Sequence, residues 1–236
     1  MSPDAVLSRP SRRRPPSWLA WGSASLLGAF LALAPAPVDA TLDHARMRAA
    51  MSAEYGSQGV RALDEWLNLI DRLRGADLRT QLRDVNDFFN RKMQWLEDRT
   101  IWRQSDYWAT PIESLGRGAG DCEDYSIAKY VTLKELGIPI SKLRMIYVRA
   151  RLGRSQITQA HMVLGYYETP GAEPLILDNI AAGISRASLR TDLDPLFSFN
   201  SSGLWAGGTT QSRADPLARL SRWRNALDRM RQQGIQ

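Results

Sequence analysis

A single cysteine stands where a nucleophile is expected. Cys122 is the only cysteine in the chain, and residues 125–136 after it carry helix start and stop signals: acidic residues at the beginning, a lysine near the end and Gly137 beyond. Cys122 therefore falls in the first turn of a predicted helix, where the helix dipole and free backbone N–H groups stabilise a thiolate and an oxyanion. A cysteine is also often a small buried apolar residue, so its position alone leaves both interpretations open.

His161 is the candidate base for such a nucleophile. It lies in the apolar stretch 159–164, where an imidazole packs no better than valine and needs a polar partner. Lone strand histidines are usually structural, but a hairpin loop centred near residues 170–171 makes residues whose numbers sum to about 341 face each other. Asp178 and Asn179 both fall near the position opposite His161, and a slip of one residue exchanges them. The order Cys, His and then Asp or Asn is that of a thiol acyl-transfer triad.

Three carboxylates, Asp121, Glu123 and Asp124, crowd the cysteine. Left unneutralised, they raise the pKa of the thiol and oppose its ionisation. In one interpretation they cap the helix and pair with basic neighbours such as Arg117. In the other they bind a hard divalent cation such as calcium, which prefers oxygen ligands. Spacing alone leaves both interpretations open.

Helices are predicted before the cysteine and a sheet after it. Apolar residues recur at helical spacing in two segments separated by Gly75. Short β-branched and aromatic runs at 143–148, 161–167 and 175–178 predict antiparallel strands, while residues 201–214 predict a loop. Helices, then a sheet, then a helix indicate an α+β fold. The helical apolar positions are Leu63, Trp66, Leu67 and Ile70, then Val85, Phe88 and Phe89.

A final helix is predicted to begin at Asp215 and Pro216, which are typical N-cap and first-turn residues. Its arginines lie mostly outside an apolar stripe, so we expect a solvated basic face, with docking to an anionic membrane or an acidic receptor as the alternative. The stripe consists of Leu217, Leu220, Trp223, Leu227 and Met230.

Three tryptophans, Trp95, Trp102 and Trp108, lie between the predicted helices and the cysteine loop. Side chains of this size contribute most when they are buried. We therefore expect most of them in the core, and a substrate groove beside Cys122 is the alternative location.

Residues 1–40 have the pattern of an export signal. Arg12, Arg13 and Arg14 precede a mostly apolar run at 18–34, and Val-Asp-Ala at 38–40 resembles a processing site. We predict a signal peptide over 1–40 and one domain over 41–236, with an uncleaved membrane anchor as the alternative. Both place the domain outside the cytoplasm.

Composition excludes several classes of protein. The chain of 236 residues is 44% hydrophobic and 24% charged, as in ordinary globular proteins, so disorder, collagen and a polytopic membrane protein are excluded. One cysteine excludes an internal disulfide and a cysteine-rich metal site. The net charge is +6, and part of it lies in residues 1–40. No nucleic-acid partner is expected.

Four segments together resemble the bacterial transglutaminase-like cysteine proteinases, in particular their periplasmic LapG type. They are Gly-Ala-Gly-Asp-Cys-Glu-Asp-Tyr-Ser-Ile-Ala-Lys-Tyr at 118–130, Leu-Gly-Ile-Pro at 136–139, Gln-Ala-His-Met-Val-Leu at 159–164 and Leu-Asp-Asn at 177–179. The similarity runs from about residue 43 to about residue 205, and these motifs are specific.

The resemblance implies a papain-like transglutaminase fold, with Cys122 as nucleophile, His161 as general base and acid, and Asp178 as the residue that orients the histidine. It also implies calcium dependence through Asp121, Glu123 and Asp124. Its implied substrate is the N-terminal region of a very large surface adhesin, whose release disperses biofilm. The implied location of the enzyme is the periplasm, and its implied inhibitor is an inner-membrane receptor for cyclic-di-GMP.

Two alternative functions use the same residues. The triad could transfer the acyl group to an amine, as a protein transglutaminase or amidase does. The domain could instead be a catalytically silent module that binds calcium and a peptide. An electrophilic thiol probe separates this second alternative from an enzyme, because only an activated thiolate reacts readily at neutral pH.

Overall fold

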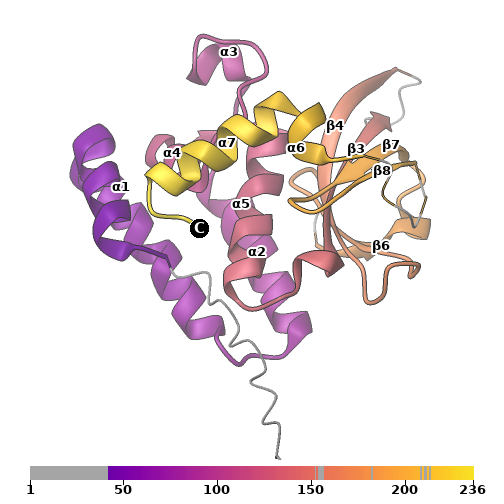
Figure 1. Cartoon of the computed structure of the whole chain (residues 1–236), viewed down its shortest axis with the longest axis horizontal. Helices are drawn as coiled ribbons and strands as arrows, with labels where there is room; N and C mark the ends of the chain where they lie inside the picture. Colours follow the sequence, from indigo (N-terminus) through magenta and orange to yellow (C-terminus); the bar gives the residue numbers. More distant parts are fainter. Residues whose placement is uncertain are drawn as a thin grey trace, which may run out of the picture. The chain divides into compact units, whose positions relative to one another are not determined.

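The computed structural model describes residues 42–151, 153, 157–181, 183–207, 209, 212 and 214–236 (Figure 1). The predicted signal peptide lies outside the described residues. None of the helices in the described part is long and apolar enough to cross a membrane.

One part of the fold is helical. Its elements are α1 (His44–Leu73), α2 (Leu78–Lys92), α3 (Asp98–Ile101), α4 (Pro111–Arg117), α5 (Cys122–Glu135), α6 (Pro216–Arg219) and α7 (Ser221–Gln232). The predicted apolar positions of the first two helices are buried or packed against the core. Gly75, with a positive φ of 75°, occupies the turn between α1 and α2.

The other part is a six-stranded antiparallel sheet in the order β6-β5-β4-β3-β7-β8. Its strands are β3 (Leu143–Arg151), β4 (Thr158–Tyr166), β5 (Leu175–Leu177), β6 (Ser185–Arg186), β7 (Leu193–Phe199) and β8 (Leu204–Ala206), with short 3-10 turns at Ile140–Lys142 and Ala187–Leu189. Helices and sheet together confirm the predicted α+β class.

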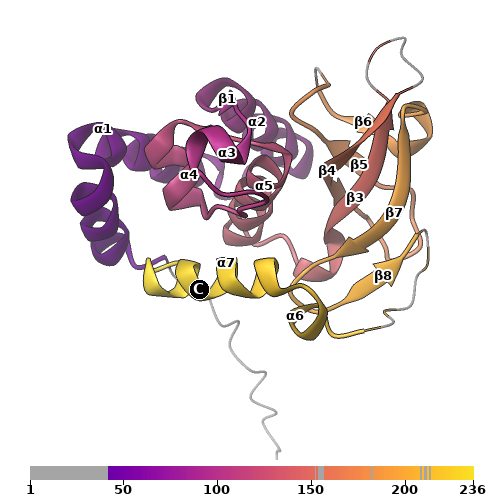
Figure 2. The same ribbon diagram turned by 90° about the horizontal axis from the view of Figure 1, so that it is seen from above.

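Helix α5 lies between the N-terminal helices and the sheet, with α2 and α4 on one side and β3 and β4 on the other (Figure 2). It is buried on almost every side, which explains why its sequence lacks a polar face. The indole N–H of Trp66 on α1 donates to the hydroxyl of Thr132 at 2.8 Å, and the hydroxyl of Ser126 donates to the carbonyl of Met162 on β4 at 3.2 Å. The first contact holds the end of α5 against α1, and the second holds its beginning against the sheet.

The hairpin register agrees with the prediction. Leu164 pairs with Leu177 and Gly165 with Ile176, so the numbers of facing residues add up to the predicted 341. Because β5 ends at Leu177, Asp178 is the first residue beyond the strand.

Two predicted elements differ in the structure. The single final helix is broken at Leu220, whose ψ of 86° is not helical. No glycine or proline marks this break, so the apolar stripe of the predicted helix continues across it without interruption. The predicted loop 201–214 contains β8, which pairs with β7. A strand of this length depends on its partner rather than on its own propensity, so the sequence pattern does not reveal it.

A two-stranded parallel pair supports the cysteine loop. Strand β1 (Gln94–Trp95) pairs with β2 (Ala119–Gly120), which ends directly before Asp121, the N-cap of α5. The N–H of Leu96 donates to the carbonyl of Gly120 at 3.1 Å. The pair therefore connects the segment after α2 to the residues that lead into α5.

Candidate active site

Cys122 is the first residue of α5, as predicted. Asp121 is the N-cap, and the first helical hydrogen bond runs from the N–H of Tyr125 to the carbonyl of Asp121 at 3.2 Å. The N–H groups of the first turn have no acceptor within the helix itself. The Cys122 side chain is partly buried and lines a cleft of about 940 Å³.

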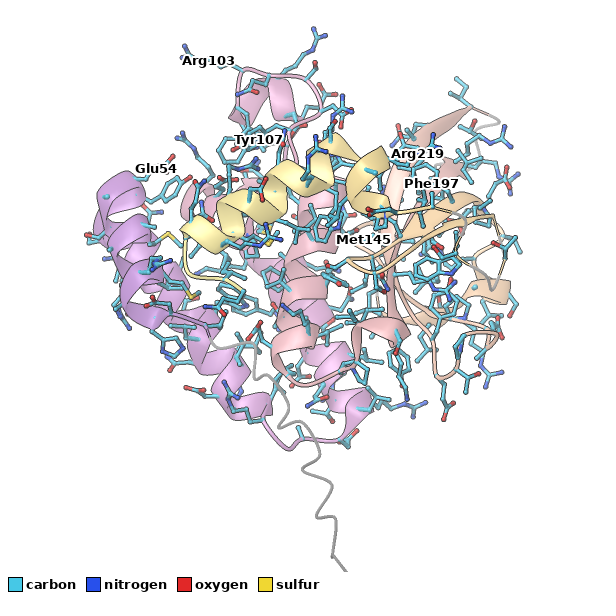
Figure 3. The ribbon with its side chains drawn as sticks, in the orientation of Figure 1. Glu54, Arg103, Tyr107, Met145, Phe197 and Arg219 are labelled. Atoms are coloured by element: carbon cyan, nitrogen blue, oxygen red, sulfur yellow. The ribbon has the colours of Figure 1, made fainter. Side chains whose placement is uncertain are left out.

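The cleft lies where the start of α5, strand β4 and the segment after β5 meet. Cys122, His161 and Asn179 line it, together with the acidic residues Asp121 and Glu123. Aromatic side chains complete its walls, among them Trp95, Trp108, Tyr147 and Phe197. Phe197 comes from β7 and is labelled in Figure 3.

The tryptophan prediction is partly wrong. Trp108 is buried as expected, but Trp95 is 50% exposed and belongs to the cleft wall. Trp102 is half-buried and packs against the Tyr107 ring, with 4.8 Å between the ring centroids. Trp95 lies on the edge of a two-residue strand, where the sequence gives no sign of exposure.

His161 and Asp178 form a buried pair. The Nε2 atom of His161 lies 2.9 Å from Oδ1 of Asp178, and the two residues are 2% and 1% exposed. The same Oδ1 accepts from the N–H of Ile180 at 3.1 Å. Since Nε2 faces the carboxylate, Nδ1 is the remaining ring nitrogen for proton exchange with a second group.

The structure distinguishes between Asp178 and Asn179 as the partner of His161. Asp178 makes the contact, whereas the Oδ1 atom of Asn179 is buried without a hydrogen-bond partner among the described residues. Asn90 on α2 supports this arrangement, because its side-chain amide donates to the carbonyl of Asp178 at 2.8 Å.

Arg190 is a site residue that the sequence did not indicate. Its Nη2 atom lies 2.7 Å from Oδ2 of Asp178 and 2.8 Å from Oδ2 of Asp192. Burial by itself raises the pKa of Asp178, but the contacts with His161, the Ile180 N–H and Arg190 together hold that pKa below its ordinary value. Arg190 follows a two-residue strand and a 3-10 turn, so neither periodicity nor a motif identified it.

The sulfur of Cys122 contacts two neighbours. Its thiol donates to Oε2 of Glu123 at 3.0 Å. Burial and then the charge of Glu123 raise the pKa of Cys122 well above its ordinary value, and a hydrogen bond with the backbone of Met162 opposes this. Met162 directly follows His161, so the nucleophile candidate and the base candidate come from neighbouring points of α5 and β4.

Asp124 fits the capping interpretation of the acidic cluster. It is fully buried, and its carboxylate accepts from the N–H of Ala109 at 2.7 Å and from that of Asp121 at 3.3 Å. The expected pairing with Arg117 is not seen. The guanidinium of Arg117 instead lies over the rings of Tyr55 and Trp102.

The cluster as a whole, Asp124 included, also fits a cation site. Carboxylate oxygens of Asp98, Asp121 and Asp124 lie within 4.8 Å of one another, as do ligand atoms of Asp121, Cys122 and Glu123. Within the described chain, Oδ1 of Asp98 and Oδ1 of Asp121 are buried without hydrogen-bond partners. Crowded buried carboxylates with free oxygens are the donor set of a hard divalent cation.

The pKa values of the cluster reflect the same crowding. Burial raises the pKa of Asp98 to about 6, and burial with the charges of Glu123 and Asp124 raises that of Asp121 to about 10. Asp98 was missed by sequence reasoning because it lies on α3, far from Cys122 along the chain.

Comparisons with known proteins agree on one family. The model of the bacterial transglutaminase-like cysteine proteinases matches residues 71–192, which is just over half of the chain. The structure of Legionella pneumophila LapG treated with EGTA is 37% identical with a TM-score of 0.69, and the match covers 79% of this chain and 97% of that one. Calcium-bound LapG from the same organism is 37% identical with a TM-score of 0.66, covering 79% and 98%. The comparison with curated proteins gave no match.

Proposed function

Because the chain belongs to the bacterial transglutaminase-like cysteine proteinases and is a cysteine peptidase with their papain-like fold, we propose that it is a calcium-dependent periplasmic endopeptidase. Its proposed substrate is the N-terminal region of a large surface adhesin. Cleavage there releases the adhesin from the cell and promotes dispersal of the biofilm.

One observation carries the catalytic assignment. The hydrogen-bonded pair of His161 and Asp178 is buried, and His161 lines the same cleft as Cys122 at the start of α5. In this proposal Cys122 is the nucleophile, His161 is the general base and acid, and Asp178 orients the imidazole.

The proposed reaction has two halves. His161 takes the thiol proton while the sulfur forms a bond to the peptide carbonyl carbon. The protonated imidazole then gives that proton to the leaving amine as the C–N bond breaks. Water, deprotonated by His161, attacks the resulting thioester, and the carboxylate product leaves as the thiol is restored.

Backbone groups stabilise the oxyanion in both halves. The first-turn N–H groups of α5 lie next to the nucleophile and have no helical acceptors. Because α5 is packed on several sides, these donors are held in position before the substrate arrives, and little reorganisation is needed during the reaction.

Calcium is the proposed metal. The solved relatives include LapG in calcium-bound and EGTA-treated forms. We assign Asp121, Glu123 and Asp124 as ligand residues. We add Asp98, because it lies in the same cluster and its buried Oδ1 has no hydrogen-bond partner among the described residues. Bound calcium supplies positive charge that offsets the repulsion among these carboxylates and organises the loop.

The proposal also covers where the enzyme acts and what inhibits it. Residues 1–40 direct export, and 41–236 form the catalytic domain. The partner proposed on the strength of the resemblance is an inner-membrane receptor of cyclic-di-GMP that inhibits the peptidase.

The test uses the native chain, Cys122→Ala and His161→Ala with calcium and an N-terminal adhesin fragment. Only the native chain is expected to cut it, and circular dichroism should show both variants folded. Cleavage by folded Cys122→Ala would overturn the mechanism. A labelled primary amine in the same reaction tests for acyl transfer. Covalent incorporation of the label into the substrate would show that the enzyme transfers the acyl group to an amine and does not hydrolyse the bond.

A further inference from the structure

A second cavity lies on the face of the sheet that points away from α5. Alternate residues of β3 point to opposite faces. Met145 packs in the main core with the helices, whereas Ile146 and Val148 belong to a smaller cluster with Val163 and Ile176. These four residues line a cavity of about 270 Å³.

Arg144 extends into this apolar cavity from the beginning of β3. It is only 4% exposed and lines the cavity wall. Its guanidinium is stacked between two aromatic rings, 4.6 Å from the centroid of Tyr167 and 4.0 Å from that of Trp205. Such stacking stabilises the cation and fixes the plane of the guanidinium fork.

The charge of Arg144 has no carboxylate counterpart in the described chain. Its polar contacts there are the carbonyl oxygens of Thr209 and Pro170, both at 3.5 Å, and its Nε atom is buried without a partner. Burial lowers the pKa of Arg144, yet an arginine stays charged at physiological pH. A buried cation without an anion is costly to the fold.

The second arginine in the cavity wall is already neutralised. Arg190 lines the cavity, but Asp178 and Asp192 both lie within ion-pair distance of it. The cavity therefore offers one unmatched positive charge and favours a ligand with a single negative charge. The planar fork of Arg144 matches a carboxylate in two parallel hydrogen bonds.

We propose that this cavity binds a small organic carboxylate with a short apolar body, its carboxylate on Arg144 and its body among Ile146, Val163 and Ile176. At ~30 Å³ for each water displaced, the volume corresponds to roughly ten non-hydrogen atoms. Octanoate has this size and chemistry and serves as the probe.

The experiment titrates the native chain by calorimetry with octanoate, octanol and acetate. Octanol keeps the apolar body without the charge, and acetate keeps the charge without the body. Octanoate is expected to bind about tenfold or more tightly than either, since octanol lacks the charge that pairs with Arg144 and acetate lacks the apolar body that fills the cavity. Equal affinity for octanol and octanoate, or the absence of saturable octanoate binding at millimolar concentration, would overturn the proposal.

Three variants locate the site. Arg144→Met keeps the apolar stem and should lose at least tenfold in octanoate affinity, whereas Arg149→Met removes an exposed arginine of the same strand outside the cavity and should bind as the native chain does. Ala187→Leu fills part of the cavity while Arg144 stays intact, so it should also weaken binding even if Arg144→Met fails to fold. Native-like affinity in folded Ala187→Leu would show that the ligand binds elsewhere. None of these outcomes depends on the proposed peptidase function.

Discussion

The hydrogen bond between His161 and Asp178 is supported by the guanidinium of Arg190. Arg190 contacts the carboxylate oxygen that His161 leaves free, so both oxygens of Asp178 have charged or polar partners. A carboxylate held in this way cannot rotate away from the imidazole without breaking the contact with Arg190. We therefore infer that Arg190 positions Asp178, and through it His161.

Replacing Arg190 should impair catalysis more than substrate binding. Arg190→Met removes a contact that fixes Asp178, and we expect kcat to fall about tenfold to a hundredfold with little change in KM, as small misplacements of catalytic groups do. Arg190→Lys should recover part of this loss. Steady-state kinetics on a peptide substrate measure both effects, with exposed Arg186→Met as the matched control.

The pH profile distinguishes positioning from general destabilisation. Arg190 lowers the pKa of Asp178, so its loss raises that pKa and moves the acid limb of kcat to higher pH. An unchanged profile with equally reduced kcat at every pH would contradict the positioning role.

The sequence predicted the residues that carry local signals. Cys122 was placed by helix start signals, and the register of a short hairpin narrowed the partner of His161 to Asp178 or Asn179, because both inferences depend on neighbouring residues. The choice of Asp178 came from the family resemblance, and the structure shows that contact. Arg190 and Asp98 reach the site through tertiary packing from irregular or very short elements, and no periodicity records such contacts.

Helix α5 carries a buried lysine beside the site. Lys129 is 1% exposed, and its Nζ atom lies 5.6 Å from the ring centroid of Tyr125. Burial lowers its pKa to about 7, and the charges of Asp178 and Asp87 oppose this only in part. Its burial therefore costs folding free energy wherever the unfolded chain carries the charge.

The stability of the protein should depend on pH through Lys129. The folded pKa of about 7 lies below the ordinary 10.5, so the unfolded state binds more protons between these values and native stability rises with pH across that range. Lys129→Met should raise the free energy of unfolding at neutral pH by on the order of a few kcal/mol, and the gain should shrink as pH approaches the upper value.

Urea unfolding at several pH values checks this, with Lys134→Met on the same helix as the control. If the two variants showed the same pH dependence as the native chain, burial of the Lys129 charge would not be the cause.

Helices and strands were predicted correctly where the contacts that define them lie close together in the sequence. The β4 and β5 register followed from a local turn and was predicted correctly. The break at Leu220 and the pairing of β8 with β7 depend on contacts made only in the folded protein, and both were missed.

Across the whole molecule, the carboxylate cluster joins segments that are distant in sequence. Asp98 comes from α3, whereas Asp121 and Asp124 come from the beginning of α5. A cation bound there links the two segments and binds only the folded state. At a hundredfold excess over Kd, calcium should therefore stabilise the folded protein by about 2.7 kcal/mol and raise the thermal midpoint of unfolding.

Asp98→Asn tests the added ligand by two opposite effects. Loss of one charged ligand should weaken calcium affinity about tenfold or more. Without calcium the same variant should be more stable than the native chain, by ~1–2 kcal/mol, because it removes a buried charge from a repulsive cluster. Calorimetry and thermal unfolding in EGTA measure these effects, with exposed Asp71→Asn as control. Unchanged affinity would remove Asp98 from the site.

The central claim is that His161 activates Cys122, and alkylation of the thiol tests it without a known substrate. Cys122 is the only cysteine, so the intact mass reports its reaction with iodoacetamide unambiguously. With calcium at neutral pH, native Cys122 should react about tenfold or more faster than in folded His161→Ala, because the thiolate is the reacting species. Equal alkylation rates in the two proteins would contradict the account.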